Sequence, residues 1–161
     1  MISFFLSGCI ESSDDNSNGL NFIFTLLDGE EKHLSDYHGK VIILDLMGVN
    51  CQPCFYQMFE LEKIFENYSS NVLTIISIDV WIVHGEDADL INEYIDYITD
   101  EFDLSLSWTF GLDDTDGTIF SQYAQNGVPT IYILNQNGNI YYSHVGYTDY
   151  PTLSAKLEEL L

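Results

Sequence analysis

The sequence predicts an α/β fold, a sandwich in which helices flank a mixed central β-sheet. Three observations lead to this class. Two apolar runs rich in β-branched residues, 41–46 and 72–78, have the length and composition of buried strands. The segment between them carries apolar side chains at the spacing of an amphipathic helix. Two further strand patterns and a closing helix follow between residues 130 and 161.

A β-hairpin is expected at the start of the folded part. Residues 22–27 have the pattern of a strand, residues 28–29 form the Asp-Gly of a tight turn, and residues 31–34 have the pattern of a returning strand. A helical turn is then expected to begin at Ser35 or Asp36.

The strand at 41–46, the following helix and the strand at 72–78 are expected to form a βαβ unit with parallel strands. The apolar positions of the helix are Met58, Leu61, Phe65 and Tyr68, and acidic residues between them are Glu60, Glu62 and Glu66. This spacing is typical of an amphipathic helix. Cys51 lies where the helix begins, so chemistry is expected at the junction of strand and helix.

The second half of the chain contributes helices and a final hairpin. The elements expected there are a helix at 87–100, a less regular stretch through Trp108 and a turn at 113–117, a short helix near 119–125, and paired strands at 130–134 and 140–145. A last helix starts near Pro151, because proline is favoured in a first helical turn. Its buried residues are predicted to be Leu153, Leu157, Leu160 and Leu161.

Length and charge limit the functions that the chain can have. The 161 residues fit one folded domain, which we place at 20–161, after a flexible acidic segment at 1–19. The formal net charge is -22, with four Lys and no Arg. Phosphate binding needs clustered cations, so nucleic acid is an unsuitable partner and anionic headgroups are repelled.

The N-terminal segment resembles a lipoprotein signal. A short apolar stretch ends in Leu6-Ser7-Gly8-Cys9, and a polar run follows at 11–19. The resemblance implies that Cys9 receives a diacylglyceryl group, that the polar run is a tether, and that the protein is anchored to the membrane outside the cytoplasm. No Lys or Arg precedes Cys9, unlike a typical signal peptide. The alternative is an apolar N-terminus with an incidental cysteine.

Cys51-Gln52-Pro53-Cys54 has the spacing that thiol-disulfide exchange requires. One accessible thiolate attacks a foreign disulfide, and a second thiol nearby resolves the mixed disulfide. At a helix N-terminus, Cys51 faces free backbone N–H groups that favour its thiolate, while Cys54 is shielded one turn inside. Pro53 fits the first turn, where its missing N–H has no helical partner.

Metal binding is the main alternative for this cysteine pair. A structural zinc site needs two more ligands, and the four histidines are scattered singly at His33, His38, His84 and His144. The acidic turn at 113–117 does not fit a calcium loop, because the first and last ligand positions fall on Leu112 and Tyr123. We therefore predict no metal and no cofactor. Cu(I) binding by the two cysteines remains an alternative function.

Asp45 is the carboxylate most suited to assist the cysteines. It interrupts an otherwise apolar strand and precedes Cys51 by six residues. Burial raises the pKa of a carboxyl group, and a proton acceptor beneath Cys54 could deprotonate that thiol as it attacks. The alternative is a hydrogen-bonded Asp with no catalytic part.

Taken together, these motifs resemble the thioredoxin superfamily, and within it the membrane-anchored TlpA/ResA branch. The residues that carry the resemblance, which spans about 20–161, are the strand that ends in Asp45, the Cys51–Cys54 motif, Gly127-Val128-Pro129-Thr130 and Gly138-Asn139-Ile140. The resemblance implies a thioredoxin-like sandwich with a cis peptide bond before Pro129, which then lies against the disulfide. It also implies that residues of about 80–105 form an insertion before the cis-proline motif.

The resemblance further implies which residues contact substrate. The Val128 backbone is expected to pair with an extended substrate segment, and Pro129 joins Cys51, Cys54 and Asp45 in the catalytic set. The remaining residues that we assign to the substrate-binding surface are Gln52, Pro53 and Thr130. The sequence departs from the family at Met47 and Asn50, where aromatic residues are usual, and at Gln57, where many anchored members have an acid.

The function implied is reduction of disulfides in exported proteins, such as apocytochromes during cytochrome c maturation, with electrons from a membrane thiol-disulfide carrier. A disulfide-forming oxidase of the same fold is the alternative, and the redox potential separates the two. A peroxidase of the peroxiredoxin type would need an Arg near its reactive cysteine, and the chain has none.

Overall fold

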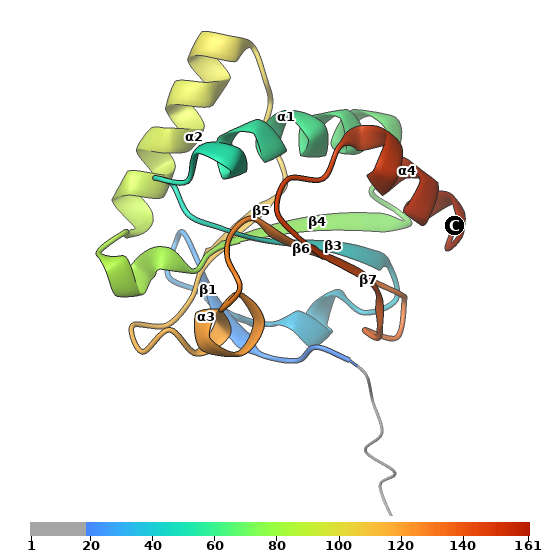
Figure 1. Ribbon diagram of the computed structural model, residues 1–161, viewed down its shortest axis with the longest axis horizontal. Helices are drawn as coiled ribbons and strands as arrows, with labels where there is room; N and C mark the ends of the chain where they lie inside the picture. Colours follow the sequence, from blue (N-terminus) through green and yellow to red (C-terminus); the bar gives the residue numbers. More distant parts are fainter. Residues whose placement is uncertain (1–18) are drawn as a thin grey trace, which may run out of the picture.

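The computed structural model describes residues 19–161 and shows one seven-stranded mixed sheet with helices on both faces (Figure 1). The strand order is β2-β1-β5-β4-β3-β6-β7. The elements are β1 (Ile23–Leu26), β2 (Glu31–His33), the 3-10 helix η1 (Leu34–Tyr37), β3 (Val41–Met47), α1 (Gln52–Asn67), β4 (Leu73–Asp79), the 3-10 helix η2 (Trp81–His84), α2 (Ala88–Phe102), β5 (Thr109–Leu112), α3 (Thr118–Tyr123), β6 (Thr130–Leu134), β7 (Ile140–Val145) and α4 (Tyr150–Glu158). The predicted thioredoxin-like sandwich is confirmed.

The interior of the sheet holds the active-site elements. β3 pairs in parallel with β4 over its whole length and antiparallel with β6, and every residue of β3 is buried. Alternate β3 side chains point to opposite faces: Ile43 and Met47 pack with α1, whereas Ile42, Leu44 and Leu46 pack against the face that includes α3. The expected βαβ unit and both expected hairpins are present.

One strand was missed. The prediction left the stretch around Trp108 irregular, but Thr109–Leu112 forms β5, which joins β1 to β4 inside the sheet. The strand is only four residues long and contains a glycine, so its pattern is weak. Gly111 is required by packing, since a Cβ there would lie 2.5 Å from Cδ2 of Phe24.

The helices follow the prediction with two corrections. Glu60 and Glu62, expected between the apolar positions of α1, are buried because they accept hydrogen bonds from backbone N–H groups: Glu60 from the start of α4, and Glu62 from the loop before β5. At the C-terminus Leu153 and Leu157 are buried, but Leu160 is half-buried and Leu161 is exposed, because α4 ends at Glu158.

The expected insertion at about 80–105 contains η2 and α2, which connect β4 to β5. α2 covers the same face of the sheet as α1, whereas η2 contacts α3, since His84 packs against Phe120. Cys9 and the rest of the expected signal segment, residues 1–18, lie outside the described residues. Within residues 19–161, no helix is both long enough and apolar enough to cross a membrane.

Candidate active site

Cys51 and Cys54 form a disulfide at the beginning of α1, with their Cα atoms 5.2 Å apart. Cys51 is the N-cap residue, and its Sγ accepts a hydrogen bond from the Cys54 N–H at 3.2 Å. Cys51 keeps 5% of its surface exposed while Cys54 keeps none. The sulfur of Cys51 is therefore the one that a substrate can reach, and it lies where backbone N–H groups favour a thiolate.

The loop before β6 brings a second segment to this sulfur. The Val128–Pro129 peptide bond is cis, as the resemblance implied, and the Val128 carbonyl oxygen lies 3.6 Å from Cys51 Sγ. Thr130 is buried, unlike Gln52 and Pro53, two other residues predicted to bind substrate. The Thr130 side chain donates a hydrogen bond to the Gly127 carbonyl at 2.6 Å, whereas Gln52 and Pro53 are exposed beside the disulfide.

Asp45 lies on the β3 face that packs against α1, between Ile43 and Met47. It is fully buried, and burial raises its pKa to about 7 although the Ser77 hydroxyl donates a hydrogen bond to Oδ2 at 2.9 Å. Asp45 Oδ1 has no hydrogen-bond partner among the described protein atoms. Asp45 can therefore exchange a proton at neutral pH, on the face of the sheet that carries Cys54.

The hydrogen bond to Asp45 has a fixed direction. Trp108 Nε1 donates to Ser77 Oγ at 3.0 Å, and an indole nitrogen can only donate. The Ser77 hydroxyl proton is then directed to Asp45 Oδ2, which leaves Oδ1 as the position for a bound proton. The Tyr94 hydroxyl, from α2, is also buried and has no hydrogen-bond partner within residues 19–161, and its pKa is raised by burial and by the charge of Asp45.

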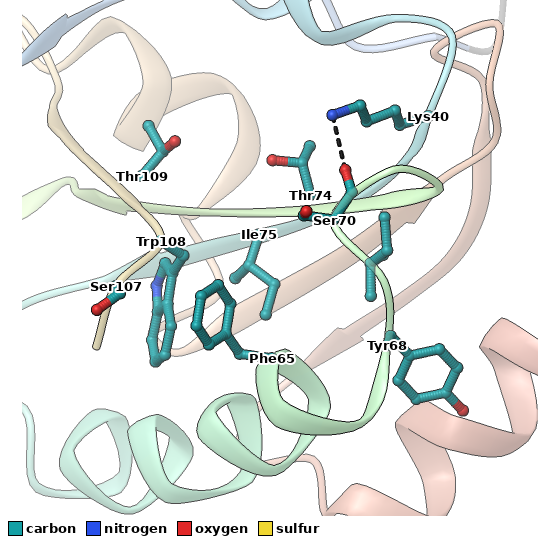
Figure 2. A pocket seen from close by; sticks show the side chains of 10 residues that line it. Lys40, Phe65, Tyr68, Ser70, Thr74, Ile75, Ser107, Trp108 and Thr109 are labelled. Atoms are coloured by element: carbon teal, nitrogen blue, oxygen red, sulfur yellow. Dashed lines mark hydrogen bonds between the residues drawn. The ribbon is translucent and has the colours of Figure 1, made fainter. Parts of the chain in front are cut away.

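Trp108 also lines a hollow of about 430 Å³. The hollow lies at the opposite end of the central strands from the disulfide. Figure 2 shows the Trp108 indole beside the ring of Phe65, near the amino end of β4. At the rim of the hollow, the Lys40 ammonium group donates a hydrogen bond to the Ser70 carbonyl. Cys51 follows the carboxyl end of β3, which runs parallel to β4. The hollow is therefore separate from the redox site.

Glu86, which the sequence prediction did not single out, holds the loop that leads to Cys51. Its carboxylate accepts hydrogen bonds from Val49 N–H (2.7 Å), Asn50 N–H (3.0 Å) and the Asn50 side-chain amide (2.6 Å). Glu86 is 5% exposed and follows η2, inside the expected insertion. The one sequence feature that pointed to Glu86 was indirect: its partner Asn50 stands where the family usually has an aromatic residue.

Asp79 and Glu86 are neighbouring carboxyl groups with different pKa shifts. Burial and then the neighbouring Glu86 raise the pKa of Asp79, which favours its protonated form. Burial alone would raise the pKa of Glu86, but the neighbouring Asp79 carboxyl group and the hydrogen bonds from Asn50 and Val49 outweigh it and lower the pKa. Glu86 is therefore the ionised member, and its charge faces the loop before Cys51.

Gln57 and Met47 show what replaces the usual family residues. The Gln57 amide donates to the Thr148 carbonyl at 2.9 Å and accepts from the Thr148 N–H at 2.8 Å. This pairing uses both halves of an amide, which a carboxylate could not provide. Met47 is fully buried in the core beneath α1.

These features define the class of the protein: a thioredoxin fold with a CxxC disulfide that caps α1 beside a cis-proline loop. A model of the AhpC/TSA family matches residues 19–143, and the chain belongs to that family.

Curated relatives agree with the predicted TlpA/ResA-like branch, which is confirmed. The chain is 24% identical to "Thiol-disulfide oxidoreductase ResA" of Geobacillus kaustophilus over 77% of its length, and it spans 65% of that relative. It is 27% identical to "Thioredoxin-like protein YneN" of Bacillus subtilis, with 86% of this chain and 75% of that one aligned.

Solved structures show the same fold. A thiol-disulfide isomerase from Corynebacterium glutamicum superimposes with a TM-score of 0.74 at 19% identity, covering 91% of this chain and 97% of the other. StoA from Bacillus subtilis superimposes with a TM-score of 0.67 at 18% identity, covering 86% and 97%.

Proposed function

We propose that the chain is a thiol-disulfide oxidoreductase that works through Cys51 and Cys54. The observation that carries the proposal is the disulfide itself, placed at the N-terminus of α1 with one sulfur exposed beside the Val128–Pro129 loop. Relatives over three quarters of the chain bear the name thiol-disulfide oxidoreductase. Peroxide reduction is not proposed, because the chain lacks an Arg to assist a reactive cysteine.

The reaction follows from the positions of the two sulfurs. The reduced Cys51 thiolate attacks a substrate disulfide, forms a mixed disulfide and expels one substrate thiolate. Cys54 then attacks Cys51 Sγ, so that the second substrate thiolate leaves and the protein disulfide forms. The substrate gains two electrons and two protons, and an external dithiol must reduce the protein again.

Asp45, Val128 and Pro129 have supporting roles in this proposal. Asp45 accepts the Cys54 proton at Oδ1 as the mixed disulfide is resolved, since its raised pKa makes proton transfer from a thiol less unfavourable. The Val128 carbonyl and Pro129 align an extended substrate segment against Cys51. Gln52 and Pro53 form the exposed rim of the same surface.

We further propose that the enzyme reduces disulfides in exported proteins, with apocytochromes among the candidate clients and a membrane thiol carrier as the electron source. The Leu6-Ser7-Gly8-Cys9 motif supports a lipid anchor on Cys9 and a position outside the cytoplasm. Mass analysis of the N-terminal peptide from expressing cells, compared with a Cys9→Ser variant, tests the anchor. An unmodified Cys9 would refute it.

The redox potential is the decisive measurement. The full chain is equilibrated in graded thiol-disulfide buffers, free thiols are alkylated, and the oxidised fraction is read by mass. A midpoint near -270 mV, the thioredoxin end of the scale, is expected for a reductase, whereas one near -120 mV would indicate an oxidase. A Cys54→Ser variant should accumulate the mixed disulfide on Cys51. If the cysteines never pair, the proposal fails and copper analysis follows.

A further inference from the structure

An exposed cluster of aromatic rings begins one helical turn after the redox cysteine. We call it the aromatic patch, and its members are Phe55, Tyr56, Phe59, Tyr97 and Phe102. Phe102, at the end of α2, lies 5.5 Å from Phe55 and 5.3 Å from Phe59, measured between ring centroids. The patch therefore joins α1 and α2, which lie on the same face of the sheet (Figure 1).

The patch is continuous with the reactive sulfur. Cys51, Phe55 and Phe59 are four residues apart, so they form one stripe along α1. The outer members are widely exposed: Tyr56 by 52%, Tyr97 by 54% and Phe102 by 41%. A substrate bonded to Cys51 can extend along this stripe without leaving the helix surface.

The charges around the patch are mainly negative. α2 contains five acidic residues and no basic residue. Glu93, Asp100 and Glu101 are exposed and lie three or four residues from Tyr97, on the same side of the helix. The one cation nearby, Lys63, has its ammonium group 2.8 Å from Glu60 and is paired.

Aromatic faces next to carboxylates suit a cationic partner. Ring faces attract Lys and Arg side chains, and aromatic residues dominate the binding energy of protein interfaces. A second copy of this chain, with a formal charge of -22, would meet electrostatic repulsion at the same surface. Complementarity therefore selects a positively charged occupant.

We propose that the aromatic patch and the acidic side chains of α2 bind a basic, apolar segment of the substrate polypeptide next to its disulfide. The inference rests on the proposed function and names its substrate class.

Paired peptides test the charge preference. Two peptides with the same cysteine spacing and the same Phe and Leu residues carry either Lys or Glu around an internal disulfide. The reduced full chain should react with the Lys peptide about tenfold faster than with the Glu peptide at low salt. This is the smallest rate enhancement typical of electrostatic steering, and it should shrink as the salt concentration rises. Equal rates would overturn the inference.

Variants then locate the surface. Tyr97→Ser with Phe102→Ser should slow the Lys peptide several-fold but leave reaction with a small neutral disulfide unchanged, whereas Tyr141→Ser, an exposed tyrosine on β7, should have no effect on either. Neutralising Glu93, Asp100 and Glu101 as amides should reduce the Lys preference. Neutralising three acids on other elements, Glu31, Asp116 and Glu158, provides an equal change in net charge and should reduce it less.

The outcomes separate the two proposals. If the small disulfide and both peptides fail to react, the proposed function is wrong. If the small disulfide reacts but the variants of the patch and of the other elements behave alike, the oxidoreductase stands and the docking surface is refuted. Formation of a concentration-dependent dimer that the patch variants abolish would also refute it, because the occupant would then be a second copy.

Discussion

Two buried carboxyl groups that flank the active-site segment, Asp45 on β3 and Glu86 after η2, have pKa values shifted in opposite directions. Asp45 receives one hydrogen bond, from Ser77, and its pKa rises to about 7. Glu86 receives three hydrogen bonds from Val49 and Asn50, and its pKa is lowered. Burial raises the pKa of both groups, but only Glu86 has a neighbouring carboxyl group, that of Asp79, and three hydrogen-bond donors that together outweigh it. One can move a proton, and the other holds a loop.

The largest expected effect comes from removing the titrating group. Asp45→Asn keeps an acceptor for Ser77 but cannot take a proton, so resolution of the mixed disulfide by Cys54 should slow about 100-fold at pH 7. Single-turnover release of the second substrate thiol measures this step. The first step, attack by Cys51, provides the internal control and should change little. An unchanged resolution rate would make Asp45 a structural residue only.

The same variant should become more stable at high pH. The pKa of Asp45 is raised from 3.8 to about 7 in the fold, so the native state binds more protons and loses stability as pH rises from about 4 to 7. The full penalty is about 4 kcal/mol above pH 7, at 1.36 kcal/mol per pKa unit. Urea unfolding of Asp45→Asn should therefore show a gain at pH 8 and none near pH 4. Parallel curves for the two proteins would contradict this reasoning.

The second effect concerns the loop that Glu86 holds. Both oxygens of Glu86 accept hydrogen bonds. In Glu86→Gln the amide nitrogen replaces one oxygen and faces an N–H donor, so the variant should lose about 2 kcal/mol of stability. Because Val49 and Asn50 directly precede Cys51, the exchange rate should also fall several-fold. Urea unfolding and rates with a small disulfide measure the two effects.

Glu62 provides a matched control for this variant. It also accepts three hydrogen bonds, from Ser105 N–H, Ser105 Oγ and Leu106 N–H, but it holds the loop between α2 and β5. Glu62→Gln should lose similar stability and keep the exchange rate. If both variants reduce the rate equally, the effect of Glu86 comes from lost stability and not from the position of the active-site loop.

The smallest effect sharpens the account of Asp45. Ser77→Ala removes the one hydrogen-bond donor that Asp45 has in the described part of the chain, so the pKa of Asp45 should rise by about one unit or less. The pH midpoint of the resolving step reports the shift. Trp108→Phe should shift it less in the wild-type background and not at all in the Ser77→Ala background. An equal shift in both backgrounds would mean that Trp108 acts by another route.

The local elements were predictable because their signals are local. The apolar strand β3, the helix that begins at Cys51 and the hairpin of β6 and β7 each have a period or a turn within a few residues. β5 was missed because four residues with a glycine give no period. Its place between β1 and β4 depends on partners that lie far away in the sequence.

The site was predictable in part. Asp45 was visible because a charge inside an apolar strand is conspicuous, and the cysteine motif identified the helix start. Glu60, Glu62 and Glu86 gave no such signal, since acids on helices and in loops are usually solvated. They are buried because distant backbone N–H groups, such as that of Tyr150, need acceptors.

The sequence by itself determined the class of fold, the redox pair and the helix N-terminus that activates it, because these depend on residues within one or two turns of each other. Only the tertiary structure decided that Val128 meets Cys51, which lies 77 positions away, and that Glu86 binds the loop at Asn50. It also decided the charge of Asp45. Desolvation and hydrogen bonding depend on everything packed around a group, and no local pattern records that environment.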